Sequence, residues 1–230
     1  IVVGLLRLLL VSTKSLGGII TLNGSLTINT SAILDATNAG NFAINLAGDW
    51  TNNGGTFTPR TGTVTFNGNN ILQTIGGTST TAFNIIAVAK TSLANTLEVA
   101  SAITLSGGGL TLTSGTFKLS GTFSLTNTFF SSSAYTIGST AGFWLNNSNA
   151  IVSAQNGSPT LNGLLRISSG TFNAGTSNNS MTWGNGSIFT MEGGAFNVAA
   201  RFAPSSATST NSIAFTMSSG TFTVAMGTST

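Results

Sequence analysis

The residue types that carry most enzyme chemistry are scarce in this sequence. It has no histidine and no cysteine, and its only acids are Asp35, Asp49, Glu98 and Glu192. Glycoside hydrolysis by its usual route needs two carboxylates about 5 to 9.5 Å apart. Asp49 and Glu98 are 49 residues apart, which would place them about two turns apart in a repetitive fold. One lies in a Gly-Asp-Trp turn and the other in an alternating strand, so unrelated surface acids are the favoured interpretation.

Other catalytic and metal-binding arrangements have even less support. The missing histidine excludes a Ser-His-Asp triad, and the missing cysteine excludes both disulfides and thiolate metal sites. Four dispersed acids do not predict a Ca²⁺ site, which needs clustered oxygen ligands. We therefore expect no enzymatic activity, no metal and no cofactor.

Three tryptophans are the best candidates for binding a ligand. Flat aromatic rings can stack on the faces of sugar rings, so Trp50, Trp144 and Trp183 could form an exposed glycan platform. The alternative is that they are bulky core or edge residues. A glycan-binding module is therefore the second functional hypothesis.

The basic residues do not form a cluster. Seven Lys and Arg stand against four acids, giving a net charge of +3. Their spacing predicts scattered solubilising charges rather than a nucleic-acid interface, which needs grouped phosphate contacts. They include Lys14, Lys90, Lys118, Arg60, Arg166 and Arg201.

A strand-turn-strand unit recurs along the chain. Residues 110–119, 165–174, 189–198 and 215–224 share two apolar residues two apart, a small-Gly corner, then Phe and a second apolar residue two positions later. The last three corner glycines are 24 and 26 residues apart, and a degenerate copy at 135–145 with one inserted residue divides the longer first gap of 55. The corners are Gly115, Gly170, Gly194 and Gly220.

This repeat predicts an all-β fold, a single parallel β-helix (β-solenoid). Period-two alternation is typical of strands with one buried face, and a fixed period of this length indicates a solenoid. We expect roughly nine turns of about 24 to 28 residues. Two internal ladders are expected, one of Phe117, Phe172, Phe196 and Phe222 and one of Leu112, Ile167, Met191 and Met217.

The runs 46–68 (LAGDWTNNGGTFTPRTGTVTFNG) and 73–77 (QTIGG) resemble repeats of large secreted and cell-surface bacterial proteins. Similar tracts occur in adhesin-like and autotransporter-passenger-like β-helix proteins. The resemblance covers about residues 42–126, and the remainder shares only the Gly-Thr-Phe style. It implies export, a β-solenoid and a role at the surface or in a matrix, and it carries over no catalytic residue.

The N-terminal segment 1–16 is predicted to be separate from a repeat domain at 17–230. Its apolar part is shorter than the roughly 20 residues that span a bilayer, so we expect no membrane span. It is either the remnant of a signal peptide or a strand that caps the core or joins subunits. The candidate assembly residues are Ile1, Val2, Val3, Leu5, Leu6, Leu8, Leu9 and Leu10.

The sequence therefore predicts a structural protein that is extracellular or on the cell surface. Unprotected strand edges would let it polymerise with copies of itself into a filament or matrix. An adhesin stalk that contacts glycans or host surfaces, and of which this chain is one piece, is the competing interpretation.

Overall fold

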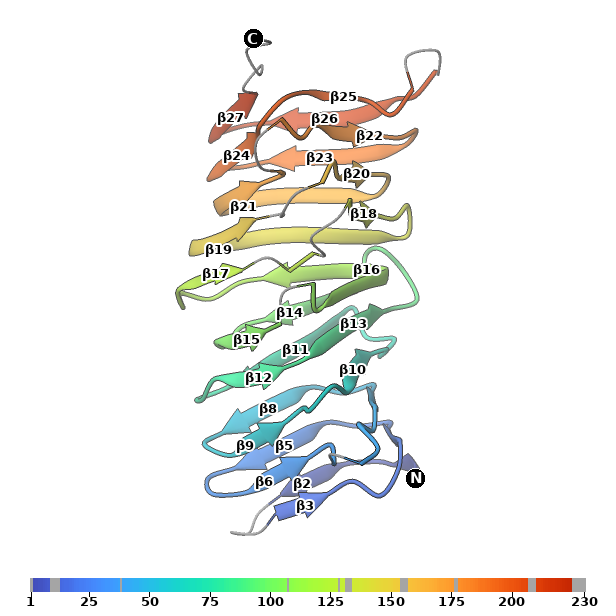
Figure 1. Ribbon diagram of the computed structural model, residues 1–230, viewed down its shortest axis with the longest axis vertical. Helices are drawn as coiled ribbons and strands as arrows, with labels where there is room; N and C mark the ends of the chain where they lie inside the picture. The colour runs from blue at the N-terminus through green and yellow to red at the C-terminus, as the bar shows by residue number, and fades with distance from the viewer. Residues whose placement is uncertain are drawn as a thin grey trace. The chain divides into compact units, whose positions relative to one another are not determined.

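The fold is a β-solenoid. The computed structural model describes residues 2–8, 13–37, 39–106, 108–127, 129–130, 134–153, 157–175, 178–206 and 210–224, and these contain strands and turns but no helix. The chain divides into two compact units, 1–117 and 118–230. Parallel strands stack coil on coil in both units, with about eight turns in all (Figure 1). The predicted parallel β-helix is confirmed.

The first unit contains two continuous ladders of parallel strands. One comprises β1 (Val2–Val3), β4 (Ile20–Leu22), β7 (Ile44–Leu46), β10 (Thr63–Phe66), β13 (Ile85–Ala89) and β16 (Leu110–Leu119). The other comprises β2 (Leu6–Leu8), β5 (Leu26–Asn29), β8 (Trp50–Asn53), β11 (Leu72–Gly77) and β14 (Thr96–Val99).

The third ladder of the first unit is interrupted. One sheet holds β3 (Thr13–Ser15), β6 (Ile33–Asp35) and β9 (Thr56–Thr58). A separate sheet holds β12 (Thr81–Phe83) and β15 (Ile103–Leu105). The neighbouring strands β9 and β12 therefore belong to different sheets.

Alternating side chains form the core of the first unit. In β4 and β5, Leu22, Leu26 and Ile28 are fully buried while the threonines between them are partly exposed. This alternation follows from the pleat, which sends successive side chains to opposite faces. Trp50 is also fully buried, and its ring centroid lies 4.8 Å from that of Phe57.

The second unit has three parallel ladders. The first comprises the start of β19 (Ala141–Ser153), the start of β21 (Leu164–Asn173), β23 (Ser187–Met191) and β26 (Ile213–Met217). The second comprises β17 (Leu125–Asn127), the ends of β19 and β21, β24 (Ala195–Val198) and β27 (Thr221–Val224). The third comprises β18 (Thr136–Ile137), β20 (Thr160–Leu161), β22 (Met181–Trp183) and β25 (Phe202–Pro204).

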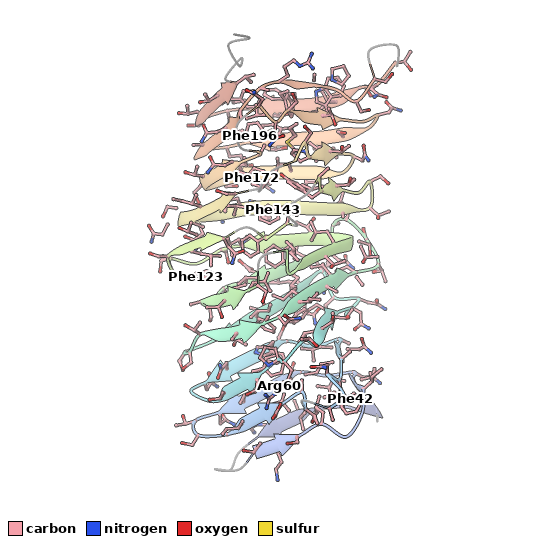
Figure 2. All side chains as sticks on the ribbon, viewed as in Figure 1. Phe42, Arg60, Phe123, Phe143, Phe172 and Phe196 are labelled. Atoms are coloured by element: carbon pink, nitrogen blue, oxygen red, sulfur yellow. The ribbon has the colours of Figure 1, made fainter. Side chains whose placement is uncertain are left out.

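Phenylalanines stack in register through the second unit. Phe172 pairs with Phe196, and Phe196 pairs with Phe222. The rings of the first pair are nearly parallel, 15° between planes at 6.1 Å, and those of the second are 4.9 Å apart at 23°. Figure 2 shows Phe172 and Phe196 on neighbouring coils. Ile167, Met191 and Met217 form the parallel column expected beside them.

The remaining members of the expected ladders differ in their burial. Phe117 is buried and Leu112 is half-buried, and both belong to the first unit. Met217 is 42% exposed, so it is not a core residue among the described coils.

Coil length and one repeat copy differ from the sequence-based expectations. Asn45 pairs with Thr65 and Phe196 pairs with Phe222, so coils of 20 to 26 residues occur. The copy proposed at 135–145 does not align as expected, because Phe143 pairs with Leu165. The residue in register with Phe172 is Val152.

The corner glycines adopt the left-handed conformation. Their φ angles are 84° at Gly115, 91° at Gly170, 68° at Gly194 and 100° at Gly220. A Cβ atom at Gly170 would lie 2.4 Å from the carbonyl oxygen of Asn147, one coil away. Both the backbone angle and the close approach of the preceding coil therefore require glycine there.

The N-terminal strands pair with the strands that follow them. β1, β2 and β3 pair with β4, β5 and β6, so the described residues 2–8 and 13–15 continue the stack of coils. Leu5 is exposed and Leu6 is half-buried. Of the candidate assembly residues, Ile1, Leu9 and Leu10 lie outside the described residues.

Candidate functional site

A corner of the first unit joins the ends of β6 and β9 through an ion pair. Arg60 donates from Nε to Oδ1 of Asp35 and from Nη2 to Oδ2, both at 2.9 Å. The backbone N–H of Thr37 donates to the same Oδ1 at 2.9 Å. These hydrogen bonds, with that of Arg60 the stronger influence, lower the pKa of Asp35 to about 2. The pair therefore remains ionised at neutral pH.

Three non-glycine residues at this corner have left-handed backbones. The φ angles are 69° at Thr37, 46° at Asn41 and 56° at Arg60. Hydrogen bonds hold them in place, since the Thr37 hydroxyl donates to the Leu16 carbonyl oxygen and Oδ1 of Asn41 accepts from the N–H of Thr61. Such conformations cost free energy and persist only where their surroundings fix them.

A depression of about 340 Å³ lies beside this corner, across the interruption of the third ladder. We call it the Arg60 depression; Figure 2 labels Arg60 itself. Phe83 and Leu105 are almost fully buried there, whereas Arg60 and Thr104 are exposed. Its lining residues are Pro59, Arg60, Ala82, Phe83, Asn84, Thr104, Leu105 and Ser106.

Sequence reasoning missed this site because Arg60 was grouped with the scattered charges. The available signal was the spacing of opposite charges. Asp35 and Arg60 are 25 residues apart, and Arg166 and Glu192 are 26 apart, each close to one coil. Opposite charges separated by one repeat become neighbours when coils stack.

Lys90 is not a surface charge, contrary to the sequence-based expectation. It is 3% exposed, and its Nζ donates to the carbonyl oxygen of Gly68 at 3.1 Å and to Oε1 of Gln73. Nε2 of Gln73 in turn donates to the carbonyl oxygen of Leu46 at 2.8 Å. Burial lowers the pKa of Lys90 to about 8, and the charge of Asp49 partly opposes this shift. The group joins successive coils through backbone carbonyls.

The acids considered for glycoside hydrolysis lie in one column of the first unit. Thr74 pairs with Glu98, and the Thr74 N–H donates to Oδ1 of Asp49 at 2.8 Å. Asp49 and Glu98 are thus two coils apart, as the spacing predicted, which corresponds to roughly 10 Å along the stack. Among the described residues, no group of three metal-ligating side chains occurs.

The tryptophans differ in their surroundings. Trp50 of the second ladder is fully buried, so for this residue the alternative of a bulky core residue is confirmed and the exposed platform is not. Its Nε1 donates to the hydroxyl of Thr81 at 3.3 Å. The Gly-Asp-Trp sequence resembles a turn and did not reveal that the indole is in the interior. Trp183 is half-buried and lies in register between Leu161 and Pro204.

Trp144 of the second unit contacts protein cations. Nζ of Lys118 lies 4.4 Å from its ring centroid and Cζ of Arg166 lies 4.0 Å from it. Arg166 also pairs with both carboxylate oxygens of Glu192, at 3.1 and 2.7 Å. Hydrogen bonding to Arg166 is the main cause that lowers the pKa of Glu192. The indole therefore serves as a cation–π partner within the protein rather than as a free sugar platform.

One coil of the second unit presents apolar side chains to solvent. Phe215, Met217 and Val224 of β26 and β27 are 45%, 42% and 39% exposed, and Phe222 is half-buried. Their in-register equivalents in β23 and β24 are almost fully buried. Within the described chain, β26 and β27 each pair on one side only. We call Phe215, Met217, Phe222 and Val224 the β26–β27 edge.

Comparisons with known proteins give no match: no protein-family model, curated protein or solved structure matches this chain. Among the described residues there is no helical segment with the length and hydropathy of a transmembrane span.

Proposed function

We propose that the protein is a structural component of an extracellular or cell-surface assembly, in which β-solenoid coils of separate molecules stack end to end. The in-register stacking of successive coils is the observation that carries this proposal, because the contacts that join one coil to the next can also join one molecule to another. A further coil stacked on the β26–β27 edge, supplied by a second copy, would bury Phe215, Met217 and Val224. The low charge of the chain and its resemblance to adhesin-like repeats support the extracellular setting.

Docking on this edge is favourable for the same reasons that successive coils stack. The Phe189 and Phe215 rings are parallel within 4° at 5.1 Å, and the partner coil would continue this contact on the other side. A heterologous contact that does not close on itself produces a fibre. A surface stalk or matrix filament would use this property directly.

Sedimentation velocity and negative-stain electron microscopy of the chain over a range of concentrations test the proposal. We expect assembly that increases with concentration and produces elongated particles. The double substitution F215E/V224E should abolish it, because each new carboxylate would be buried at the joint. Ile71→Glu is the matched control, since Ile71 is 78% exposed and is not one of the residues of the edge. Monomers at every concentration, or assembly that survives F215E/V224E, would reject end-to-end stacking through this edge.

A further inference from the structure

We propose that the Arg60 depression binds a neutral saccharide. This inference goes beyond end-to-end assembly and does not rest on it. The depression measures about 340 Å³, within the range of small-molecule sites. It belongs wholly to the first unit, where residues that follow β9 face residues of β12 and β15.

The polar groups of the depression suit a ligand with hydroxyl groups. Asn84, Thr104 and Ser106 offer an amide and two hydroxyls, each able to donate and to accept. Arg60 donates to Asp35 from Nε and Nη2. The N–H groups of Nη1 and the second N–H of Nη2 can donate to a further acceptor. Donors and acceptors are thus mixed, as the two roles of a sugar hydroxyl require.

The charge balance favours a neutral ligand over an anion. Arg60 is the only cation among the described residues that line the depression, and the carboxylate of Asp35 compensates it at 2.9 Å. A phosphate or sulfate would meet that carboxylate beside the guanidinium. A purely apolar ligand would instead displace water from the Asn84 amide, the Thr104 hydroxyl and the remaining N–H groups of Arg60 without replacing its hydrogen bonds, which is costly.

The apolar part of the lining completes the match. Pro59, Ala82, Phe83 and Leu105 supply carbon surface between the polar groups. A pyranose ring has hydroxyl groups at its rim and an apolar C–H face. The hydroxyl groups can hydrogen-bond to the polar lining residues, and the C–H face can pack on the apolar ones. The left-handed backbone at Arg60 and the hydrogen bonds around Thr37 hold the fork in position before a ligand arrives.

Saturation-transfer-difference NMR with separate solutions of glucose, galactose, mannose, N-acetylglucosamine, cellobiose and chitobiose tests the site. We expect saturation of at least one of these probes, with a dissociation constant on the order of millimolar because the site is shallow. Ala82→Phe should abolish the signal by filling the depression without removing a polar group. Thr56→Phe adds the same ring at an exposed position of β9 that does not line the depression, and it should retain the signal.

Ala82→Phe and Thr56→Phe are compared after circular dichroism has shown that each keeps the wild-type spectrum. The double substitution N84A/S106A should weaken binding at least tenfold. No saturation transfer with any of the six sugars, or an equal signal in A82F, would overturn the proposal. Displacement of the sugar by millimolar inorganic phosphate would identify an anion site instead. None of these results depends on assembly, which F215E/V224E tests separately.

Discussion

The two units share one fold but fill their interiors differently. The second unit places like residues in register, so that Phe172, Phe196 and Phe222 stack and Phe189 stacks on Phe215. The first unit instead packs an aromatic cluster around Trp50 and buries the charged side chain of Lys90 against Gln73. The phenylalanine column of the second unit repeats one contact from coil to coil, whereas the buried polar side chains of the first unit join coils through individual hydrogen bonds.

Removing a ring from the stacked phenylalanine column of the second unit is expected to have the largest effect on stability. Phe196 lies fully buried between Phe172 and Phe222, so Phe196→Ala should lower the free energy of unfolding by about 3 to 5 kcal/mol. Denaturant titration followed by circular dichroism measures this. Phe222→Ala is the control and should cost clearly less, because Phe222 is half-buried. Equal costs would show that the column does not carry the stability of this unit.

The glycine corners of the second unit separate backbone strain from steric contact. Gly170 and Gly186 both have positive φ, at 91° and 76°, but only Gly170 has neighbours within 4 Å of an added Cβ. Gly186→Ala should therefore cost about 1 to 2 kcal/mol, from the backbone conformation alone.

Gly170→Ala should cost more, about 2 to 4 kcal/mol, since the Asn147 carbonyl must also move. Thermal unfolding of the two variants side by side gives the comparison. If their melting temperatures agree, close coil contact contributes nothing to the requirement for glycine.

The buried lysine predicts a pH dependence for the first unit. The pKa of Lys90 is lowered to about 8 in the folded chain, below its ordinary value of 10.5. Between these values the unfolded chain binds a proton that the folded chain does not, so stability should rise with pH by roughly 1 to 3 kcal/mol and then level off. Urea titrations from pH 7 to 11 measure it.

Lys90→Met should remove this rise, whatever its effect on stability at pH 7. Lys118→Met is the matched control in the second unit, where Lys118 is half-buried over Trp144, and it should keep the rise. A rise that persists in K90M would assign the pH dependence to another group.

The smallest expected effect concerns a tyrosine of the second unit. The hydroxyl of Tyr135 is buried and has no hydrogen-bond partner within the described chain, and burial raises its pKa. Tyr135→Phe should therefore stabilise the protein by about 0.5 to 1 kcal/mol. Tyr135→Leu, which loses the 4.0 Å stacking on Phe130, should destabilise it. Calorimetry that finds Y135F less stable than wild type would reveal a partner for the hydroxyl.

The sequence was sufficient to predict the fold and the register of the regular coils. The Gly-Thr-Phe spacing aligned Phe172, Phe196 and Phe222 because those coils differ in length by only two residues. Phe143 was misplaced because every side of a coil carries the same apolar-Thr-apolar pattern. A period-two signal reports which face is buried, but it does not report which ladder a strand joins.

The candidate site was not predictable from local patterns. Arg60, Asn84 and Ser106 belong to three successive coils, and only their stacking brings them together. Lys90 and Trp50 were misjudged for a related reason, since burial depends on which coil covers them. The charge or aromatic character of a residue can be read at its own position in the sequence. The Arg60 depression instead depends on the break between the sheets of β9 and β12, which no single position indicates.

The short, regular coil sets how the chain would respond to tension. Each coil is held mainly by its neighbours, so a pulling force applied at one end detaches coils one after another. A coil such as that from Phe172 to Phe196 contains 24 residues, and its release lengthens the chain by about 80 Å. A surface stalk built in this way would extend in repeated steps of similar size and absorb mechanical load without failing at once.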